Sequence, residues 1–180
     1  MALFRKGPPP HQTALAMIGA RAGARVLVVG TPPPGVVAAL AGVTGLNGQT
    51  LLVVAPGARA PYESAAAEAG VLLETLDALA DPFALPPTPG DHDVVVIHSD
   101  LATIDDAIRR SLVGAAFAAL RPGGRIVIVE GRPATGWFSR RGPTLSFESA
   151  IALLEAAGGL AARQLGAVEG VTYFEARKGQ

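Results

Sequence analysis

The sequence predicts an α/β domain in which a mostly parallel β-sheet is covered by helices on both faces. Short apolar runs bounded by Gly, Pro or Asp alternate with helical stretches along the chain, as expected of βαβ units. The composition is 49% hydrophobic and only 17% charged, which suits strands that helices bury from both sides. The 180 residues suffice for one such core. We therefore expect a single doubly wound domain over residues 1–180, with a flexible start at residues 1–10.

Three strands alternate with three helices in the first half of the prediction. Each strand is a short apolar run, and each helix is rich in Ala or carries apolar residues at helical spacing. The strands are expected at residues 25–29, 51–54 and 72–76. The helices are expected at residues 11–19, 35–41 and 60–69.

The second half begins after a Pro-rich loop at residues 82–90. Residues 93–97, Asp-Val-Val-Val-Ile, form an unbroken apolar run and predict a central, buried strand. Thr103 is expected to cap the next helix, with Asp105 and Asp106 near the positive end of the helix dipole. One face of that helix is expected to carry the apolar residues Ile104, Ile108, Leu112, Ala116 and Leu120.

Glycine and proline mark the ends of the predicted elements in the next segment. Pro122-Gly123-Gly124 is expected to stop the preceding helix and to turn the chain into a fifth strand at residues 125–129. A Gly- and Pro-rich loop follows at residues 131–143. Ser146 then stands where an N-cap of a last helix is expected, and Gly158 stands just after the end of that helix.

The end of the chain predicts a β-hairpin. Two strands are expected at residues 161–166 and 171–177, and the turn sequence Glu169-Gly170 separates them. With the five strands before it, the hairpin completes a seven-stranded sheet whose last two strands form an antiparallel pair at one edge.

The composition also limits the location and the partners. The chain has 0 Cys, which excludes thiolate catalysis, thiolate zinc sites and disulfides, so we expect a reducing, cytoplasmic location. Neither a signal peptide nor an apolar run of about 18 residues is found. Ten acidic residues and no Lys or Arg lie between residues 60 and 108, which disfavours nucleic acid. The expected partner is a small molecule, another protein or a second copy of the chain.

The most specific local pattern lies at residues 120–130, Leu-Arg-Pro-Gly-Gly-Arg-Ile-Val-Ile-Val-Glu. Together with Asp93-Val-Val-Val-Ile97 and Leu76-Asp77-Ala78, this pattern resembles the class I S-adenosylmethionine-dependent methyltransferases, especially the small-molecule enzymes of quinone pathways. The resemblance covers residues 9–178. It implies a Rossmann-like methyltransferase fold and an S-adenosylmethionine site in which Asp77, after the third strand, faces the adenine.

Three departures make the cofactor-binding motifs degenerate. The loop Gly30-Thr-Pro-Pro-Pro-Gly35 stands where the family has three glycines, and its prolines lack N–H donors. Val28 and Ala55 stand where the family has an acid in the first strand and an acid that holds the ribose. Each lost charged hydrogen bond costs about 1.5 to 3 kcal/mol. The alternative explanation of the loop is structural: Thr31 caps the following helix, and prolines fill its first turn.

The candidate site residues follow from the resemblance and from the ends of the strands. If the cofactor site is retained, its residues are Gly30, Thr31, Gly35, Asp77, Ala78 and His98. His98 and Asp100 are the catalytic candidates, because they follow the fourth strand at the expected switch point. His98 can accept a proton and Asp100 can orient it; the alternative is that His98 only packs. Glu130 ends the fifth strand and is either a site residue or a surface charge.

An aromatic and basic cluster lies on the loop at residues 131–145. Its members are Trp137, Phe138, Arg140 and Arg141. A loop of this length and composition predicts a substrate lid or a docking surface, and the alternative is an ordinary connection whose aromatic side chains pack on the sheet.

Two functions of different class remain. The degenerate motifs favour a catalytically silent methyltransferase-like module that binds or assembles with a partner. The alternative is an active small-molecule methyltransferase with a divergent cofactor loop, since methyl transfer from a sulfonium depends mainly on positioning. Neither a nicotinamide nor a P-loop pattern is complete. His11, His92 and His98 show no metal-ligand spacing, so no metal is expected.

Overall fold

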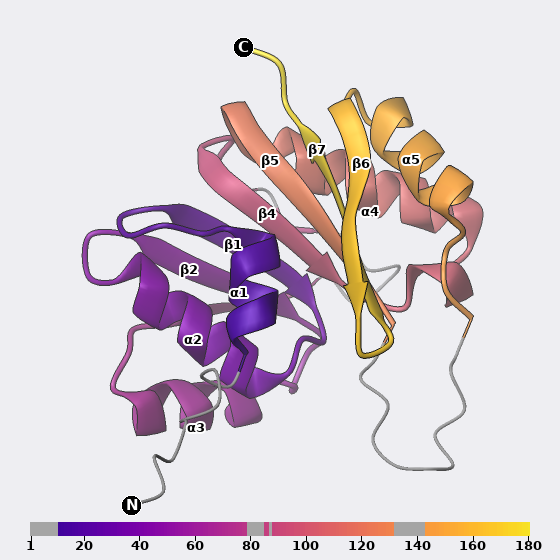
Figure 1. Cartoon of the computed structure of the whole chain (residues 1–180). Coiled ribbons are helices and arrows are strands. Elements are labelled where there is room, and N and C mark those ends of the chain that lie inside the picture. Colours follow the sequence, from indigo (N-terminus) through magenta and orange to yellow (C-terminus); the bar gives the residue numbers. More distant parts are fainter. Residues whose placement is uncertain (1–10, 79–84, 87, 132–142) are drawn as a thin grey trace, which may run out of the picture.

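The computed structural model describes residues 11–78, 85–86, 88–131 and 143–180. The described residues form a seven-stranded sheet with helices against it (Figure 1). Among them, no helix is both long and apolar enough to cross a membrane. The predicted flexible start at residues 1–10 lies outside the described residues, as do Trp137, Phe138, Arg140 and Arg141 of the predicted lid.

The elements alternate along the chain as the sequence predicts. The strands are β1 (Arg25–Gly30), β2 (Gln49–Val54), β3 (Glu74–Asp77), β4 (His92–His98), β5 (Leu120–Glu130), β6 (Leu160–Val168) and β7 (Val171–Arg177). The helices are α1 (Gln12–Ile18), α2 (Pro34–Thr44), α3 (Ala60–Ala69), the short 3-10 helix η1 (Leu101–Thr103), α4 (Asp106–Ala118) and α5 (Phe147–Ala156).

The sheet has the strand order β3-β2-β1-β4-β5-β7-β6. β1 pairs in parallel with β2 and with β4, and β4 pairs in parallel with β5. β7 runs antiparallel to both β5 and β6, so the predicted mostly parallel α/β sheet and its C-terminal hairpin are confirmed. The order reverses between β1 and β4, which makes the space outside their carboxyl ends the topological switch point of the fold.

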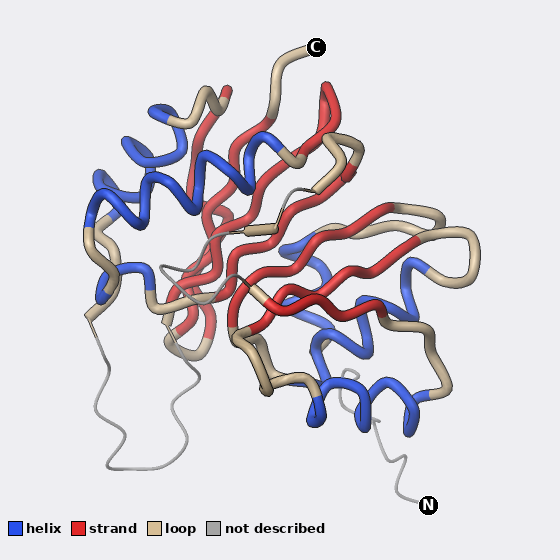
Figure 2. The backbone as a smooth tube through the Cα atoms, turned by 180° about the vertical axis from the view of Figure 1, so that it is seen from behind, coloured by secondary structure: helices blue, strands red, loops and turns tan. Residues whose placement is uncertain are grey.

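The core consists of two layers, one on each face of the sheet (Figure 2). Helices α1, α2 and α3 cover the face that carries Val28 of β1 and Val96 of β4. Helices α4 and α5 cover the face that carries Ile97 of β4 and Ile128 of β5. Because neighbouring residues of each strand are buried on opposite faces, the central strands are continuous apolar runs.

Helix α4 begins differently from the prediction. Its N-cap is Asp105, whose side chain accepts a hydrogen bond from the Ala107 N–H at 2.9 Å. Thr103 lies in η1, where its hydroxyl donates to the carbonyl of Asp100 at 2.7 Å. The predicted Thr103 cap is therefore wrong, because η1 already uses that hydroxyl.

The end of α4 also differs, whereas the start of α5 agrees with the prediction. Helix α4 ends at Ala118 rather than at Pro122. Strand β5 already begins at Leu120, and the Pro-Gly-Gly segment is an irregularity in its pairing with β4. The predicted Ser146 cap of α5 is confirmed, since its hydroxyl oxygen accepts a hydrogen bond from the Ser149 N–H at 3.1 Å.

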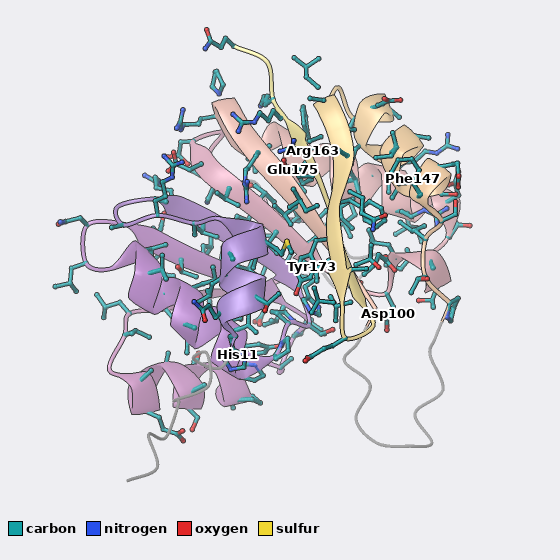
Figure 3. The ribbon with its side chains drawn as sticks, viewed as in Figure 1. His11, Asp100, Phe147, Arg163, Tyr173 and Glu175 are labelled. Atoms are coloured by element: carbon teal, nitrogen blue, oxygen red, sulfur yellow. The ribbon has the colours of Figure 1, made fainter. Side chains whose placement is uncertain are left out.

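Arg125 of β5 holds α1 against the sheet. Its guanidinium donates to the carbonyls of Met17 and Ile18 in the last turn of α1, where helix carbonyls lack partners within the helix. It also pairs with Glu175 of β7 at 3.0 Å. The Glu175 side chain is 3% exposed and pairs with Arg163 of β6 at 2.6 Å (Figure 3). The position of α1 thus depends on a buried ion-pair cluster.

Replacing Arg125 with Met should lower the free energy of unfolding by about 2 to 3 kcal/mol, because it removes charged hydrogen bonds and leaves Glu175 with a single cation. The matched control is Arg110→Met, which removes an exposed pair with Asp106 and should cost less than about 1 kcal/mol. Urea denaturation of both variants measures the difference. Equal losses in the two variants would show that the buried cluster does not hold the fold together.

Candidate functional site

A pocket of about 410 Å³ opens at the carboxyl ends of the central strands. We call it the switch-point pocket, because its walls come from the start of α2, the ends of β4 and β5, helix α1 and the β6–β7 turn. Its described polar lining residues are His11, Gln12, Thr13, His98, Glu169 and Tyr173. Its described apolar lining residues are Ala14, Ile18, Pro33, Val36, Val129, Val168 and Val171. The predicted location of the site, at the switch point, therefore coincides with a ligand-sized pocket.

The start of α2 offers few donors to a ligand. The Thr31 N–H donates to the carbonyl of His98 at 2.9 Å, and Pro32–Pro34 have no N–H. The two N–H groups after Gly35 both donate back to the carbonyl of Pro33, at 2.9 and 3.4 Å. The N–H of Gly35 is then the one remaining backbone donor in this turn that could face a ligand. The polar end of S-adenosylmethionine, which needs such donors, does not fit this helix start.

The N-cap of α2 is Pro33, which makes no side-chain capping hydrogen bond. The predicted Thr31 cap is therefore wrong, because the N-cap position lies two residues further along the chain. The other part of that explanation is confirmed, since Pro34 occupies the first helical position, where an N–H would have no partner within the helix.

The two glycines of the loop both lie close to other parts of the protein, and the backbone contact makes glycine necessary at Gly30. Gly30 has φ +108°, and a Cβ there would collide with the carbonyl of His98. A Cβ on Gly35 would lie 2.5 Å from the His11 Nε2, so the His11 ring lies against the first turn of α2. Close packing against the backbone explains Gly30 without a ligand, whereas the contact at Gly35 is with the end of an exposed side chain.

The residues expected near ribose and adenine also have other roles. Val28 is completely buried under α1–α3, and Ala55, just after β2, is only half-buried. Asp77 forms two hydrogen-bonded contacts with the guanidinium of Arg59, at 2.8 and 2.7 Å. Ala78 is buried, and its N–H donates to the carbonyl of Val54 at 2.7 Å. The Asp77 carboxylate is thus engaged by a cation of the same chain.

The two catalytic candidates lie in different surroundings. His98 is the last residue of β4, is half-buried and lines the switch-point pocket. Asp100 precedes η1, and its carbonyl accepts hydrogen bonds from the N–H and the hydroxyl of Thr103 (Figure 3). It is not among the described residues that line the pocket. The roles of His98 as base and Asp100 as its partner stay predictions.

Glu130 lies at the end of β5 on the α4–α5 side of the sheet and is completely buried. Its Oε1 accepts a hydrogen bond from the Leu101 N–H at 2.7 Å, whereas its Oε2 has no hydrogen-bond partner. Burial raises the pKa of Glu130 to about 7, although the Leu101 N–H opposes that rise. The expectation of a surface charge is wrong, because the short turn η1 covers this carboxyl group.

Five polar residues of the pocket were missed by sequence reasoning as site residues: His11, Gln12, Thr13, Glu169 and Tyr173. Tyr173 is 6% exposed, and burial together with the nearby Glu169 charge raises the pKa of its phenol. A signal for Tyr173 exists, since β7 runs antiparallel and its first residues must therefore lie at the carboxyl edge of the parallel strands. Among the described residues no three His, Asp or Glu side chains are grouped as a metal site.

No protein-family model matches the chain, and no curated protein matches it. Solved structures do match. One is an S-adenosylmethionine-dependent methyltransferase from Aquifex aeolicus, with a TM-score of 0.70 and 17% identity over 93% of this chain and 89% of that one. Another is the S-adenosylmethionine-dependent methyltransferase SibL, with a TM-score of 0.68 and 20% identity over 87% of this chain, which spans 51% of SibL. The [4+2]-cyclase SpnF matches with a TM-score of 0.68 and 16% identity, over 93% of this chain and 78% of SpnF.

These similarities establish the fold. The strand order and the antiparallel β7 are those of the class I methyltransferase fold, so the predicted resemblance is confirmed as a structural similarity. Two of these structures are named as methyltransferases and one as a cyclase. The architecture therefore carries more than one reaction, and the function has to be argued from the site.

The buried Glu130 should make the stability of the protein fall between about pH 5 and 8. The unfolded carboxyl loses its proton near pH 4.5, whereas the folded one keeps it up to about pH 7, so the unfolded state binds fewer protons in this range. Linkage then lowers the free energy of unfolding by about 2 to 3 kcal/mol as the pH rises. Glu130→Gln is neutral throughout and should lack this fall in urea denaturation. A wild-type protein that gains stability relative to Glu130→Gln over this range would contradict the assignment.

Proposed function

We propose that this chain is a catalytically silent methyltransferase-like module that binds a small molecule in the switch-point pocket without using S-adenosylmethionine. The observation that carries this proposal is the start of α2. Pro32–Pro34 have no backbone N–H groups. The N–H groups of Thr31 and of the two residues after Gly35 donate to carbonyls within the protein. A cofactor carboxylate would find one backbone donor there, and the His11 ring lies against that residue.

The other cofactor positions support the same proposal. Val28 and Ala55 replace the two acids that the family uses, and the Asp77 carboxylate is paired with Arg59. Freeing Asp77 for adenine would break two charged contacts at once. The cytoplasm and a protein partner or second copy remain our expectations for location and assembly.

The alternative is an active S-adenosylmethionine-dependent small-molecule methyltransferase with a divergent loop, and the pocket itself favours it. An open pocket of about 410 Å³ beside the end of β1, lined by His98, is what an acceptor site would need. The expectation for a silent module is that side chains fill the space beside Gly30, so this open pocket counts against a silent module without a ligand site. The proposed function keeps small-molecule binding for this reason, and it leaves out methyl transfer because the start of α2 has few backbone donors for the cofactor.

Calorimetric titration with S-adenosylmethionine and with S-adenosylhomocysteine tests the proposal. We expect no binding heat at millimolar ligand and no rise in the thermal unfolding midpoint. Binding would be visible as such a rise, because a ligand at a hundredfold excess over its Kd stabilises the fold by about 2.7 kcal/mol. The control is Ala14→Trp, which places an indole in the pocket from α1. Gly30 is unsuitable for this purpose because any side chain there collides with β4.

Binding that Ala14→Trp abolishes would overturn the silent module and favour the active enzyme. Methyl-transfer activity that His98→Ala lowers without loss of cofactor affinity would then support His98 as the base. Binding that persists in Ala14→Trp would place the cofactor outside the switch-point pocket.

A further inference from the structure

Left-handed backbone conformations gather at the switch-point pocket. Among the described residues, three that are not glycine have positive φ: His11 at 71°, Ala161 at 52° and Glu169 at 53°. His11 and Glu169 both line the pocket, and both carry ionisable side chains. Such conformations are strained for residues other than glycine, and they concentrate at functional sites. The fold therefore holds two ionisable side chains at this pocket against a local backbone preference.

The turn between β6 and β7 does not account for Glu169. Val168 pairs with Val171, so Glu169 and Gly170 form a two-residue hairpin loop with positive φ at both positions. Loops of this kind favour Asn, Asp or Gly at the first position. Gly170 meets this requirement at the second position, whereas Glu169 does not meet it at the first. A reason for the carboxylate has to be found in the pocket.

The pocket offers one acidic group to a cationic ligand, beside the histidines His11 and His98. Among the described lining residues, Glu169 is the only acid, and neither Lys nor Arg occurs. Glu169 and Tyr173 both line the pocket, and burial and, after it, the charge of Glu169 raise the pKa of Tyr173. A carboxylate beside an aromatic ring attracts an ammonium group through a charged hydrogen bond and a cation–π contact.

The rest of the pocket suits an apolar body. Ile18 of α1, Val36 of α2 and Val129 of β5 line it, and each belongs to the buried or nearly buried core on this face. Figure 3 shows His11 at the start of α1 and Tyr173 on β7, on the side of the sheet that α1 covers. His11 and Glu169 are exposed, whereas Tyr173 is as buried as the apolar lining residues Val36 and Val171.

We propose that the switch-point pocket binds a small organic amine, whose protonated amino group contacts the Glu169 carboxylate and the Tyr173 ring while its apolar body packs against α1, α2 and β5. This inference rests on the proposed function as a ligand-binding module, and it names the chemical class of the ligand. It requires no covalent step.

The probes are three indoles of similar shape that differ in charge: tryptamine is a cation, tryptophol is neutral and indole-3-acetate is an anion. Binding to the full chain is followed by NMR chemical-shift titration and by calorimetry. We expect tryptamine to bind about tenfold more tightly than tryptophol, as one partly exposed charged contact allows, and indole-3-acetate to bind more weakly than either.

Two substitutions of Glu169 separate its charge from its backbone. Glu169→Gln should reduce tryptamine affinity to that of tryptophol and leave tryptophol binding unchanged. Glu169→Asn should do the same and also raise the thermal unfolding midpoint, because Asn-Gly suits this turn. The matched control is Ala161→Asn at the opposite end of β6, which relieves the same backbone strain and should raise the midpoint without changing tryptamine affinity.

The inference fails if tryptamine does not bind at millimolar concentration, if tryptophol or indole-3-acetate binds as well as tryptamine, or if Glu169→Gln leaves the preference intact. Its failure differs from failure of the proposed function, which S-adenosylmethionine binding alone would overturn. A competition titration between tryptamine and S-adenosylmethionine distinguishes these two failures. Tryptamine binding that S-adenosylmethionine does not displace supports both proposals, whereas displacement supports the amine site and overturns the silent module.

Discussion

The close approach of Gly30 to the carbonyl of His98 is the constraint on which the candidate site depends. No side chain fits at position 30, and the Thr31 N–H donates to the same carbonyl oxygen at 2.9 Å. This contact joins β1 and β4 at their carboxyl ends, where the strand order reverses. It fixes where α2 starts and where the side chain of His98 enters the pocket, so both follow from one backbone contact.

The prolines after this contact change what the helix start can do. A helix N-terminus normally offers several N–H groups to an anion. In this chain the prolines remove some of these donors, and the carbonyl of Pro33 accepts two others. These contacts leave the Gly35 N–H as the one backbone donor of this turn that could face a ligand. The pocket lies at the topological switch point of the fold, and its described polar lining residues come from the start of α1, from β4, from β7 and from the β6–β7 turn.

The buried carboxyl groups on the two faces of the sheet have different partners. On the α1–α3 face, Glu175 is compensated by Arg125 and Arg163, and the cluster also fixes α1. On the α4–α5 face, Glu130 accepts one hydrogen bond from Leu101, and no ion pair compensates it among the described residues. Burial raises the pKa of Glu130 to about 7, although the backbone N–H groups of Leu101 and Leu145 oppose the rise, so the carboxyl end of β5 is sensitive to pH near neutrality.

The sequence by itself determined the elements, because their signals are local. The apolar run at residues 93–97, the Ser146 cap and Gly170 in the hairpin turn each specify their structure through neighbouring residues. The prediction of Thr103 rather than Asp105 as the cap of α4 was wrong, because both residue types can cap and only the formation of η1 uses the Thr103 hydroxyl. Only the tertiary structure decided the contents of the site. His11, His98, Glu169 and Tyr173 come from distant parts of the chain, and they meet only after β7 pairs with β5 and Arg125 holds α1 in place.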